Sequence, residues 1–436
     1  MSIKRILLHK GEEDRILDGH PWVYDNEIDR VLTGKGEAAV PCVLEGGDCA
    51  DVESSNKRYL GRAFVNPASK IRARLYSRSK EGADAGFFKR RIREAALRKS
   101  FLGGETSFRL IFGEADFLPG VIIDRYVGWR LKAVEAAMLK PPLNAETLAA
   151  ALGPPESFYA VQFLCAGTEA RRELIVEALV ESSAWLYSAP AAVVEKPAVS
   201  ARALEGLPPS EGLLYGALED GGIVIFEHGC PFVVDMLDGQ KTGFFLDQRD
   251  NHRAAAAYAV NKRRVLDAFC YSGGFAVHCA KAGGEEVLAA DSSESALKLV
   301  EKNAVLAGVR ERITTRKTDI FKLLTELERA KERFDMIILD PPAFAKTKNA
   351  LSGALAGYKE INLKALSLLN PAGVLVSCSC SYALNEERFK AMIHEAALDA
   401  GRRVIEAEFR GQAACHSVLY GYGESRYLKC GVYIAV

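Results

Sequence analysis

The segment 265–293 constrains the fold of this chain more than any other. An apolar run that carries one acid, Asp267, leads into a turn with two glycines, Gly273 and Gly274. A segment with helical periodicity follows, and a second apolar run ends in Asp291. A strand, glycine turn, helix and strand with a terminal acid form the first half of a nucleotide-binding α/β unit. A tight turn without a ligand gives the same pattern, so the segment alone leaves both readings open.

Each part of this pattern has a physical use in a nucleotide site. Glycines let the backbone approach a ligand closely, and the first turn of a helix presents unpaired N–H groups. An acid at the end of the second strand can accept hydrogen bonds from a ribose diol, which assigns that role to Asp291. The cofactor-binding residues predicted from this segment are Asp267, Phe269, Tyr271, Gly273, Gly274, Asp291 and Ser292.

The chain is long enough for several domains and has no evident membrane segment. It has 436 residues, of which 49% are hydrophobic and 26% charged, whereas a domain has roughly 100–200 residues. No apolar run approaches the ~20 residues of a membrane-spanning helix, and residues 1–15 are too polar for a signal peptide. Ten cysteines form no CxxC pair and no zinc-spaced cluster. We therefore predict a cytoplasmic protein with no disulfides, no metal site and no membrane association.

The net charge is zero, but basic residues are concentrated in one region. Between Lys57 and Lys99 there are 14 lysines and arginines against 3 acids. Such clustering is typical of a phosphate-binding surface, and we predict that Arg90, Arg91 and Arg93 contact RNA. A solvated helix face whose aliphatic stems cover apolar surface is an equal alternative.

Three units and a connector are expected along the chain. Residues 1–76 have short strand patterns with glycine turns, which predicts a β-barrel. Residues 77–107 form a basic helical connector, residues 108–235 a small α/β unit, and residues 236–436 a doubly wound parallel sheet. In the barrel and connector we expect helices at 13–18 and 87–101 and strands at 20–24, 36–51, 59–67 and 71–76.

Strand and helix patterns in the other two units follow the same rules. In 108–235 we expect strands at 109–112, 120–126, 185–187, 222–227 and 232–235 and helices at 144–152 and 170–180. In 236–436 we expect strands at 264–269, 286–290, 313–315, 334–340, 373–379, 404–408 and 427–435, with helices between them.

Residues 240–249, just before the glycine turn, combine two aromatics with Asp-Gln-Arg. One reading is a lip over a cofactor, with Phe245 stacking and Asp247, Gln248 and Arg249 meeting its polar end. The other reading is the start of a helix capped by Thr242 or Asp247. Asp319 after the third strand has two readings as well. It either accepts a hydrogen bond from an adenine amino group or caps the next helix.

The segment 334–344 is the most specific motif in the chain. An apolar strand ends in Asp340, followed by Pro341 and Pro342, at the edge where open α/β sheets bind ligands. Prolines fix a rigid turn and add no N–H groups that would compete for the acid. An acid and an aromatic such as Phe344, held in this way, can grip a flipped-out base by hydrogen bonds and stacking. The motif therefore predicts methylation of a nucleobase or another planar amine.

The strand at 373–379 brings two cysteines, Cys378 and Cys380, to the same edge. A cysteine in a strand is usually a small buried hydrophobic residue. The position of this strand, next to the one that ends in Asp340, makes a catalytic thiol the alternative.

These pieces, in this order, resemble the class I S-adenosylmethionine-dependent methyltransferases that make 5-methylcytidine in large-subunit ribosomal RNA. In that family a PUA-type RNA-binding barrel precedes a small α/β domain and a Rossmann-like catalytic domain. The resemblance covers nearly the whole chain and includes the segments 19–23, 113–120, 239–243, 340–342, 357–362 and 379–381.

The resemblance implies S-adenosylmethionine as cofactor, ribosomal RNA as partner and Cys380 as nucleophile. A thiolate adds to C6 of cytosine, which makes C5 reactive enough to take the methyl group. Asp340 is expected at the cytosine edge, because an anion would raise the pKa of a neighbouring thiol rather than activate it. Two departures from the family are Cys378, where an apolar residue is usual, and Ala343, where a lysine is usual. The nearest lysine here is Lys346.

Two other functions remain alternatives. N-methylation of an RNA guanine would use Asp340 and no thiol. A non-catalytic RNA-binding assembly factor would need neither, although the expected cofactor positions Asp267, Gly273, Asp291, Asp319 and Asp340 are all intact. Metabolite methylation or dehydrogenation fits less well, because the glycine turn is not the GxGxxG of dinucleotide binders. The sequence leaves open whether the chain forms a homodimer.

Overall fold

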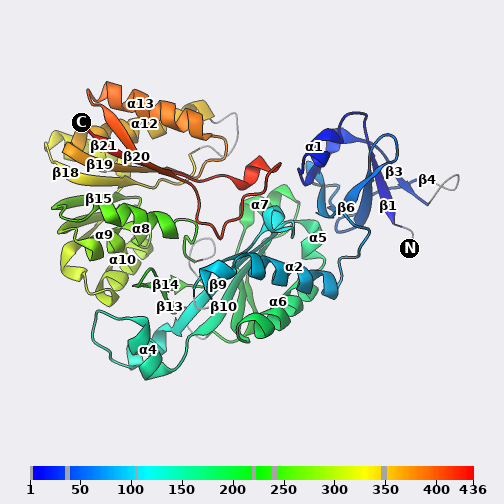
Figure 1. Cartoon of the computed structure of the whole chain (residues 1–436), viewed down its shortest axis with the longest axis horizontal. Coiled ribbons are helices and arrows are strands. Elements are labelled where there is room, and N and C mark those ends of the chain that lie inside the picture. Colours follow the sequence, from blue (N-terminus) through cyan, green and yellow to red (C-terminus); the bar gives the residue numbers. More distant parts are fainter. Residues whose placement is uncertain (1–2, 35–39, 104–105, 219–221, 238–242, 345–350) are drawn as a thin grey trace.

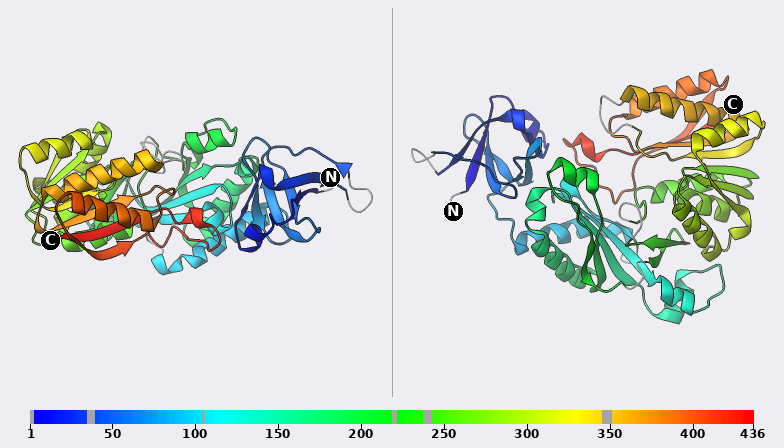
Figure 2. Two further views of the ribbon diagram at one scale, coloured as in Figure 1. Left: turned by 90° about the horizontal axis from the view of Figure 1, so that it is seen from above. Right: turned by 180° about the vertical axis from the view of Figure 1, so that it is seen from behind.

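The computed structural model describes residues 3–34, 40–103, 106–218, 222–237, 243–344 and 351–436. In these ranges the strands form three sheets of seven strands, one after another in sequence. Figure 1 shows the first sheet at one end of the molecule, the third at the other end and the second between them. The view from above in Figure 2 gives the same order. No helix within these ranges is both long and apolar enough to cross a bilayer.

The first sheet has the order β2-β7-β6-β5-β1-β3-β4 and encloses one core that includes Ile6, Val23 and Val52. β1 pairs with β5 in parallel, and the other neighbours are antiparallel. Its elements are β1 (Lys4–Leu8), α1 (Asp14–Leu17), β2 (Trp22–Tyr24), β3 (Ile28–Thr33), β4 (Val40–Pro41), β5 (Cys49–Glu53), β6 (Tyr59–Val65) and β7 (Ile71–Ser77).

The long strand expected over 36–51 is wrong in extent. Residues 35–39 lie outside the described ranges, β4 is two residues long, and no strand forms between β4 and β5 within this part of the chain. The Asp48 carboxylate explains the break, because it accepts hydrogen bonds from the Glu45 N–H (2.8 Å) and from Lys4 Nζ (2.7 Å) and so holds a turn. The strands β1 and β3 were not predicted.

The connector contains α2 (Ala85–Arg98), which packs its apolar face, including Phe88 and Ile92, into the second unit. Lys99 lies on the same buried side, as its helical spacing predicts. Its ammonium lies 2.6 Å from the Asp116 carboxylate, which neutralises a charge that could not otherwise be buried.

The second sheet has the order β12-β11-β10-β9-β13-β14, with β8 paired to β9. Only β10 and β11 run parallel among the described pairs. The strands are β8 (Phe108–Phe112), β9 (Val121–Arg130), β10 (Glu156–Phe163), β11 (Pro190–Glu195), β12 (Gly212–Gly216), β13 (Gly222–Glu227) and β14 (Cys230–Asp235). The helices are α3 (Leu131–Ala136), α4 (Ala145–Leu152), α5 (Ala166–Glu169), α6 (Arg172–Leu186) and α7 (Val199–Leu204).

The strand expected at 185–187 is wrong, because α6 continues through Leu186. The N–H of Tyr187 still donates to the carbonyl of Ser183 (2.9 Å), so the helical hydrogen-bond pattern continues through these residues. Trp185 is exposed, and the guanidinium of Arg93 lies over its ring at 4.8 Å. An apolar triplet is too short to separate a strand from the end of a helix. The strands β10, β11 and β12 were not predicted.

The third sheet has the order β17-β16-β15-β18-β19-β21-β20. Its strands are β15 (Arg264–Ala268), β16 (Glu286–Asp291), β17 (Ile313–Lys317), β18 (Phe334–Leu339), β19 (Leu369–Ser379), β20 (Val404–Arg410) and β21 (Lys429–Ala435). Its helices are α8 (Arg249–Tyr258), α9 (Gly274–Ala282), α10 (Glu294–Leu306), α11 (Ile320–Arg329), α12 (Leu351–Leu368) and α13 (Glu386–Asp399). All seven strands lie where the sequence predicts them.

The expectation of an all-parallel sheet is wrong at one place. β21 inserts between β19 and β20 and runs antiparallel to both. The segment between β20 and β21 contains no helix that could carry the chain back across the sheet, so β21 enters from the opposite end. This reversal brings the start of β21 next to the end of β19.

Helices cover both faces of the third sheet (Figure 1). Successive residues of its strands alternate between two cores: Val265 and Met336 face α9 and α10, whereas Leu266 and Ile337 face α11, α12 and α13. This alternation is what a parallel strand buried on both faces requires.

The second and third sheets share a core. Phe232 of β14 and Val265 of β15 belong to the same cluster of buried side chains. Within it, Glu227 Oε1 at the end of β13 lies 2.7 Å from His252 Nδ1 of α8 and 3.2 Å from His278 Nε2 of α9. All three side chains are buried, so this ion-pair cluster joins the second unit to the third.

The segment 411–428, between β20 and β21, touches all three units (Figure 1). Its Ser417 hydroxyl donates to Asp116 of the second unit (2.9 Å), and its Tyr422 ring lies 5.0 Å from that of Trp22 in the first. The Ala413 N–H donates to the Asp247 carbonyl beside the third sheet (2.8 Å). The segment therefore ties the first sheet and the second to the edge where β19 ends.

Removing the charge of Glu227 is expected to loosen the joint between the second and third units. Two histidines hold the pKa of this buried carboxyl far below its usual range, so the folded protein depends on its charged form. Breaking one partner of a buried pair costs about 3 kcal/mol or more. Urea titration of Glu227→Gln should show this loss, whereas Glu177→Gln on the exposed face of α6 should be neutral. Equal midpoints for the two variants would contradict the role of the cluster.

Candidate functional site

The carboxyl ends of β15, β16, β18 and β19 meet at one edge of the third sheet, beside a cavity of about 540 Å³. Parallel strands place their carboxyl ends together, so the motifs that follow these strands converge. The cavity is lined by twelve of the predicted site residues, namely Phe245, Asp247, Gln248, Phe269, Tyr271, Gly274, Asp291, Ser292, Asp340, Pro341, Pro342 and Cys380.

The turn after β15 has an unusual backbone. Phe269, Tyr271 and Gly273 all have positive φ, of 65°, 45° and 82°. Non-glycine residues reach this left-handed region at a cost of about 1 kcal/mol or more each, and such residues concentrate at functional sites. Here the conformation turns the chain away from the strand and into α9, so that Phe269 and Tyr271 face the cavity.

Asp291, at the end of β16, supports this turn and also faces the cavity. One carboxylate oxygen accepts the N–H of Tyr271 (3.0 Å), and the other accepts the N–H of Ser293 (2.8 Å). Each carboxylate oxygen can accept more than one hydrogen bond. The carboxylate is therefore held in place by the backbone and can still accept from a diol in the cavity.

Asp267 lies beneath the turn and is fully buried. Its Oδ2 accepts the N–H of Ala276 in the first turn of α9 (2.9 Å), and its Oδ1 has no hydrogen-bond partner among the described residues. Burial raises the pKa of this carboxyl well above its usual range, and the nearby Asp340 and Asp291 raise it further. A positive charge in the cavity would relieve the repulsion among these three acids.

Gly274 allows a close approach of α9 to His252. A Cβ built on Gly274 would lie 2.5 Å from His252 Nε2, which is far inside van der Waals contact. The imidazole cannot easily move away, because Glu227 holds it from the other side. The second glycine of the turn is therefore required by packing, and His252 itself lines the cavity.

Asp340 follows β18 and lies next to β15, where its N–H donates to the carbonyl of Ala268 (3.3 Å). Pro341 is buried and Pro342 is exposed, and both line the cavity. Phe344 points elsewhere. Its ring packs against Tyr358 at 4.6 Å between ring centroids, and Phe344 is not among the residues that line the cavity.

The two cysteines of β19 occupy different environments. Cys378 is fully buried within the sheet, and burial raises the pKa of its thiol well above the usual range. Cys380 is partly exposed and lines the cavity together with Asp340. The end of β19 at Ser379 accounts for the difference, because Cys378 lies within the strand and Cys380 lies beyond it. None of the ten cysteines, all of which lie in the described ranges, is in a disulfide.

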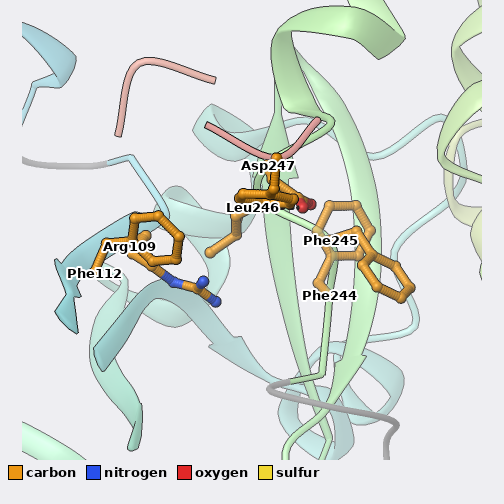
Figure 3. A pocket seen from close by; sticks show the side chains of 7 residues that line it. Arg109, Phe112, Phe244, Phe245, Leu246 and Asp247 are labelled. Carbon is orange, nitrogen blue, oxygen red and sulfur yellow. Dashed lines mark hydrogen bonds between the residues drawn. The ribbon is translucent and has the colours of Figure 1, made fainter. Parts of the chain in front are cut away.

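A second pocket of about 310 Å³ adjoins the cavity, and Phe244, Phe245 and Asp247 line both. Figure 3 shows Arg109 and Phe112, from β8, on one side of this pocket and Phe244 and Phe245 on the other. Arg109 is paired with Asp124 through two contacts of 2.7 Å. The second unit thus forms one wall beside the site.

Known protein families match the two ends of the chain. Residues 6–78 match the PUA-like domain, and residues 175–406 match the S-adenosylmethionine-dependent methyltransferases. The second match covers more than half of the chain. The chain belongs to the S-adenosylmethionine-dependent methyltransferase family.

Curated relatives of this methyltransferase align along its whole length. Proteins named ribosomal RNA large subunit methyltransferase I are 38% identical in Shewanella denitrificans, 37% in Tolumonas auensis and 36% in Vibrio vulnificus, each over 430 residues. The alignments cover 98%, 97% and 97% of this chain and the same shares of the relatives.

Two solved structures share the fold over 99% of both chains. The structure of SMU.776 in complex with SAH has a TM-score of 0.77, and that of a Streptococcus mutans S-adenosylmethionine-dependent methyltransferase has a TM-score of 0.76. Both are 19% identical to this chain. The predicted architecture, a Rossmann-like methyltransferase domain with a PUA-type domain before it and an α/β domain between them, is therefore confirmed.

The cavity of the methyltransferase fits S-adenosylmethionine. The cofactor has a sulfonium and an ammonium group, and two acids, Asp291 and Asp340, line the cavity. Asp267 lies beneath the turn beside them and has a buried oxygen without a partner among the described residues. The hydroxyl groups of the cofactor's ribose can donate hydrogen bonds to the Asp291 carboxylate. The rings of Phe245, Phe269 and Tyr271 offer aromatic surface. When bound, the cofactor supplies an electrophilic methyl group.

Some predicted residues lie away from the cavity. Asp319 is exposed and caps α11 by accepting the N–H of Lys322 (3.0 Å), so the capping alternative is realised and the adenine contact stays a prediction. Arg249 is buried and donates to the Ser107 carbonyl (3.1 Å). Asp267 and Gly273 shape the turn from below. Phe344, Arg90, Arg91 and Arg93 do not reach the cavity either.

The alternative reading of residues 240–249 as a capped helix start fails for Asp247. Its carboxylate accepts the Tyr427 hydroxyl (2.6 Å), and the residue before α8 is Gln248, which makes no capping bond with its side chain. Thr242 lies outside the described residues, and so do Gln240, Lys241 and Lys346.

Sequence reasoning missed several site residues. Phe244, His252 and Phe275 line the cavity, although only their nearness to predicted residues could have indicated it. Three more residues lie just before and at the start of β21, namely Tyr427, Leu428 and Lys429. Nothing in their sequence indicates the site, because the antiparallel insertion of β21 is what brings them to β19.

One cluster of the described residues has metal-ligand composition: Glu227, His252 and His278. Their polar atoms already form direct hydrogen bonds, as described for the joint between the units. These contacts explain the cluster as an ion-pair network beside the cavity.

Gly274→Ala is expected to weaken cofactor binding. The new methyl group would displace His252 or the first turn of α9, both of which line or support the cavity. Isothermal titration with S-adenosylmethionine should show at least a tenfold loss of affinity, which corresponds to about 1.4 kcal/mol. Gly353→Ala in α12, where a Cβ meets nothing within 4 Å, is the matched control and should bind normally. Unchanged affinity in Gly274→Ala would contradict the packing argument.

Proposed function

We propose that this methyltransferase modifies C5 of a cytidine in large-subunit ribosomal RNA in the cytoplasm. The observation that carries the proposal is the partly exposed Cys380 at the edge of the cofactor cavity, beside Asp340. The names of the curated relatives support large-subunit ribosomal RNA as the substrate. S-adenosylmethionine supplies the methyl group.

Cys380 supports the choice of cytosine because C5 of cytosine is a poor nucleophile on its own. Addition of a thiolate to C6 turns C5 into an enamine-like carbon, which is covalent catalysis. The other thiol of the strand, Cys378, is fully buried and cannot meet a base. Cys380 is thus the nucleophile of the proposed reaction.

Asp340 is proposed to bind the cytosine edge. It cannot activate the thiol by charge, because an anion disfavours a nearby thiolate. A carboxylate at N3 instead stabilises a proton on that atom while C6 is attacked, and Pro341 and Pro342 hold it there without competing N–H donors. Phe344 would need to leave its contact with Tyr358 to stack on the base, so the stacking role has no support from its packing.

RNA binding is proposed for the first unit and the basic region after it. The match to a PUA-like domain and the charge of this region support the proposal. In the structure Arg90 and Arg91 pair with Glu81, and Arg93 stacks on Trp185, so aliphatic stems and guanidinium groups of α2 also take part in packing. Of the three, Arg90 is the most exposed and the best placed to reach a phosphate.

Cys380→Ala should abolish methylation, whereas Cys378→Ala should retain most of it. Ribosomal RNA from cells that contain only the variant should be mapped for 5-methylcytidine and compared with RNA from cells without the protein. Folding is checked by retained S-adenosylmethionine binding, because Cys380 is one of many residues at the cavity. Methylation by Cys380→Ala would contradict the covalent cytosine mechanism and favour N-methylation of guanine, which needs Asp340 and no thiol.

Charge reversal of Arg90, Arg91 and Arg93 should weaken binding to ribosomal RNA in a salt-dependent way. Each lost phosphate contact lowers the slope of log affinity against log salt by about 0.7–0.9, so the slope should fall by about 1 to 3. Reversal of Lys322, Arg329 and Arg333, which are exposed or nearly so around α11, is the matched control for the change in total charge. Equal affinity and slope for both triple variants would remove α2 from the RNA surface.

A further inference from the structure

Lys429 lies beside the proposed nucleophile and is almost completely buried. It is the first residue of β21 and pairs across the antiparallel ladder with Ser379, the residue before Cys380. Its Nζ donates to the carbonyl of Ser381 (2.6 Å), the residue after Cys380, and to the carbonyl of Tyr427 (2.7 Å). Nζ is thus fixed against the backbone directly after the thiol-bearing residue.

The structure gives this lysine an unusual environment. Only 5% of it is exposed, and an ammonium has three protons to donate. The described residues accept two of them, both as neutral backbone carbonyls, and no carboxylate pairs with Nζ in this part of the chain. Burying an ammonium without an anionic partner lowers the stability of the folded protein. We therefore expect this lysine to have a functional role.

We propose that Lys429 is the proton acceptor and charge partner of the Cys380 thiol. The inference rests on the proposed covalent mechanism and deepens it. With Nζ as an uncharged amine, the Sγ proton moves to its lone pair, which leaves a thiolate beside an ammonium. The thiolate then forms the Sγ–C6 bond, the electron pair of the C5–C6 double bond shifts towards N3, and N3 takes the proton that Asp340 stabilises. After C5 has taken the methyl group, a base removes the C5 proton and the electron pair of that C–H bond re-forms the C5–C6 double bond. The C6–Sγ bond breaks, its electron pair returns to sulfur beside the same ammonium, and N3 gives up its proton.

The pKa of Lys429 lies close to that of an ordinary thiol, so transfer of the proton from sulfur to nitrogen costs little free energy. Burial lowers the pKa of Lys429 to about 8, and a Cys380 thiolate works in the opposite direction. An ordinary thiol has a pKa of about 8.5, so little free energy separates the neutral pair from the ion pair. By reciprocity the ammonium favours the thiolate as much as the thiolate favours the ammonium.

The other ionisable groups around the thiol do not replace Lys429. Tyr427 precedes β21, and burial and Asp247 raise the pKa of its phenol well above the usual range. Burial likewise raises the pKa of Tyr358 in α12, so both rings stay neutral near pH 7. Asp340 lines the same cavity, and its carboxylate would disfavour a thiolate. Of these four groups, Lys429 is the one whose positive charge favours a thiolate.

The test is the pH dependence of Cys380 alkylation by iodoacetamide, which needs no RNA and no methyl transfer. Peptides that contain both Cys378 and Cys380 are sequenced by tandem mass spectrometry, so that each thiol is scored separately. Lys429→Met should slow alkylation of Cys380 about tenfold at pH 7, as a rise of one pKa unit requires. Lys429→Arg keeps a cation and should stay within about threefold of the unmodified protein. Lys322→Met, on the exposed side of α11, is the control.

An unchanged alkylation rate in Lys429→Met, or a rate in Lys429→Arg as low as in Lys429→Met, would overturn the proposal. If Lys429→Met does not fold, the protein without substitution decides the question. Its Cys380 alkylation should have a midpoint below the ordinary thiol value of about 8.5, and a midpoint at or above that value would overturn the proposal. These outcomes are separate from those of Cys380→Ala, because alkylation reports on the thiol whether or not the thiol is used in methylation.

Discussion

The structure depends on the register of β15, β16, β18 and β19, whose carboxyl ends share one edge. This arrangement brings Asp291, Asp340 and Cys380 to one cavity, although they are separated by up to 89 positions in sequence. Burial raises the pKa of Asp267 at the base of the turn, and repulsion by the nearby Asp340 and Asp291 raises it further. That repulsion makes the edge suited to a cationic ligand, which accounts for the cofactor of this family.

The first and second units are connected to this part of the third unit by direct contacts. Glu227, His252 and His278 join the second sheet to α8 and α9, and Gly274 allows His252 to reach the cavity wall. The segment 411–428 runs from the third sheet to the first unit and returns to start β21. The segment that contacts the first unit thus continues directly into the strand that carries Lys429.

Much of the site could be predicted from the sequence because its motifs end strands of a regular α/β fold. Asp291, Asp340 and Cys380 each follow an apolar run, and parallel strands must align their ends. The roles of Asp319 and Arg249 stay predictions, because Asp319 also caps a helix and Arg249 also makes an interior contact, which their motifs do not reveal. Lys429 could not be predicted, because its position depends on the antiparallel insertion of β21, which has no local signal.

The most direct test of the account is covalent trapping on RNA that contains 5-fluorocytidine. Fluorine at C5 cannot be removed as a proton can, so a thiolate that has added to C6 should stay attached after methyl transfer. Incubation of the protein with S-adenosylmethionine and such a large-subunit ribosomal RNA should give a denaturant-resistant complex linked through Cys380. Absence of the complex, or a link through Cys378, would contradict the central claim.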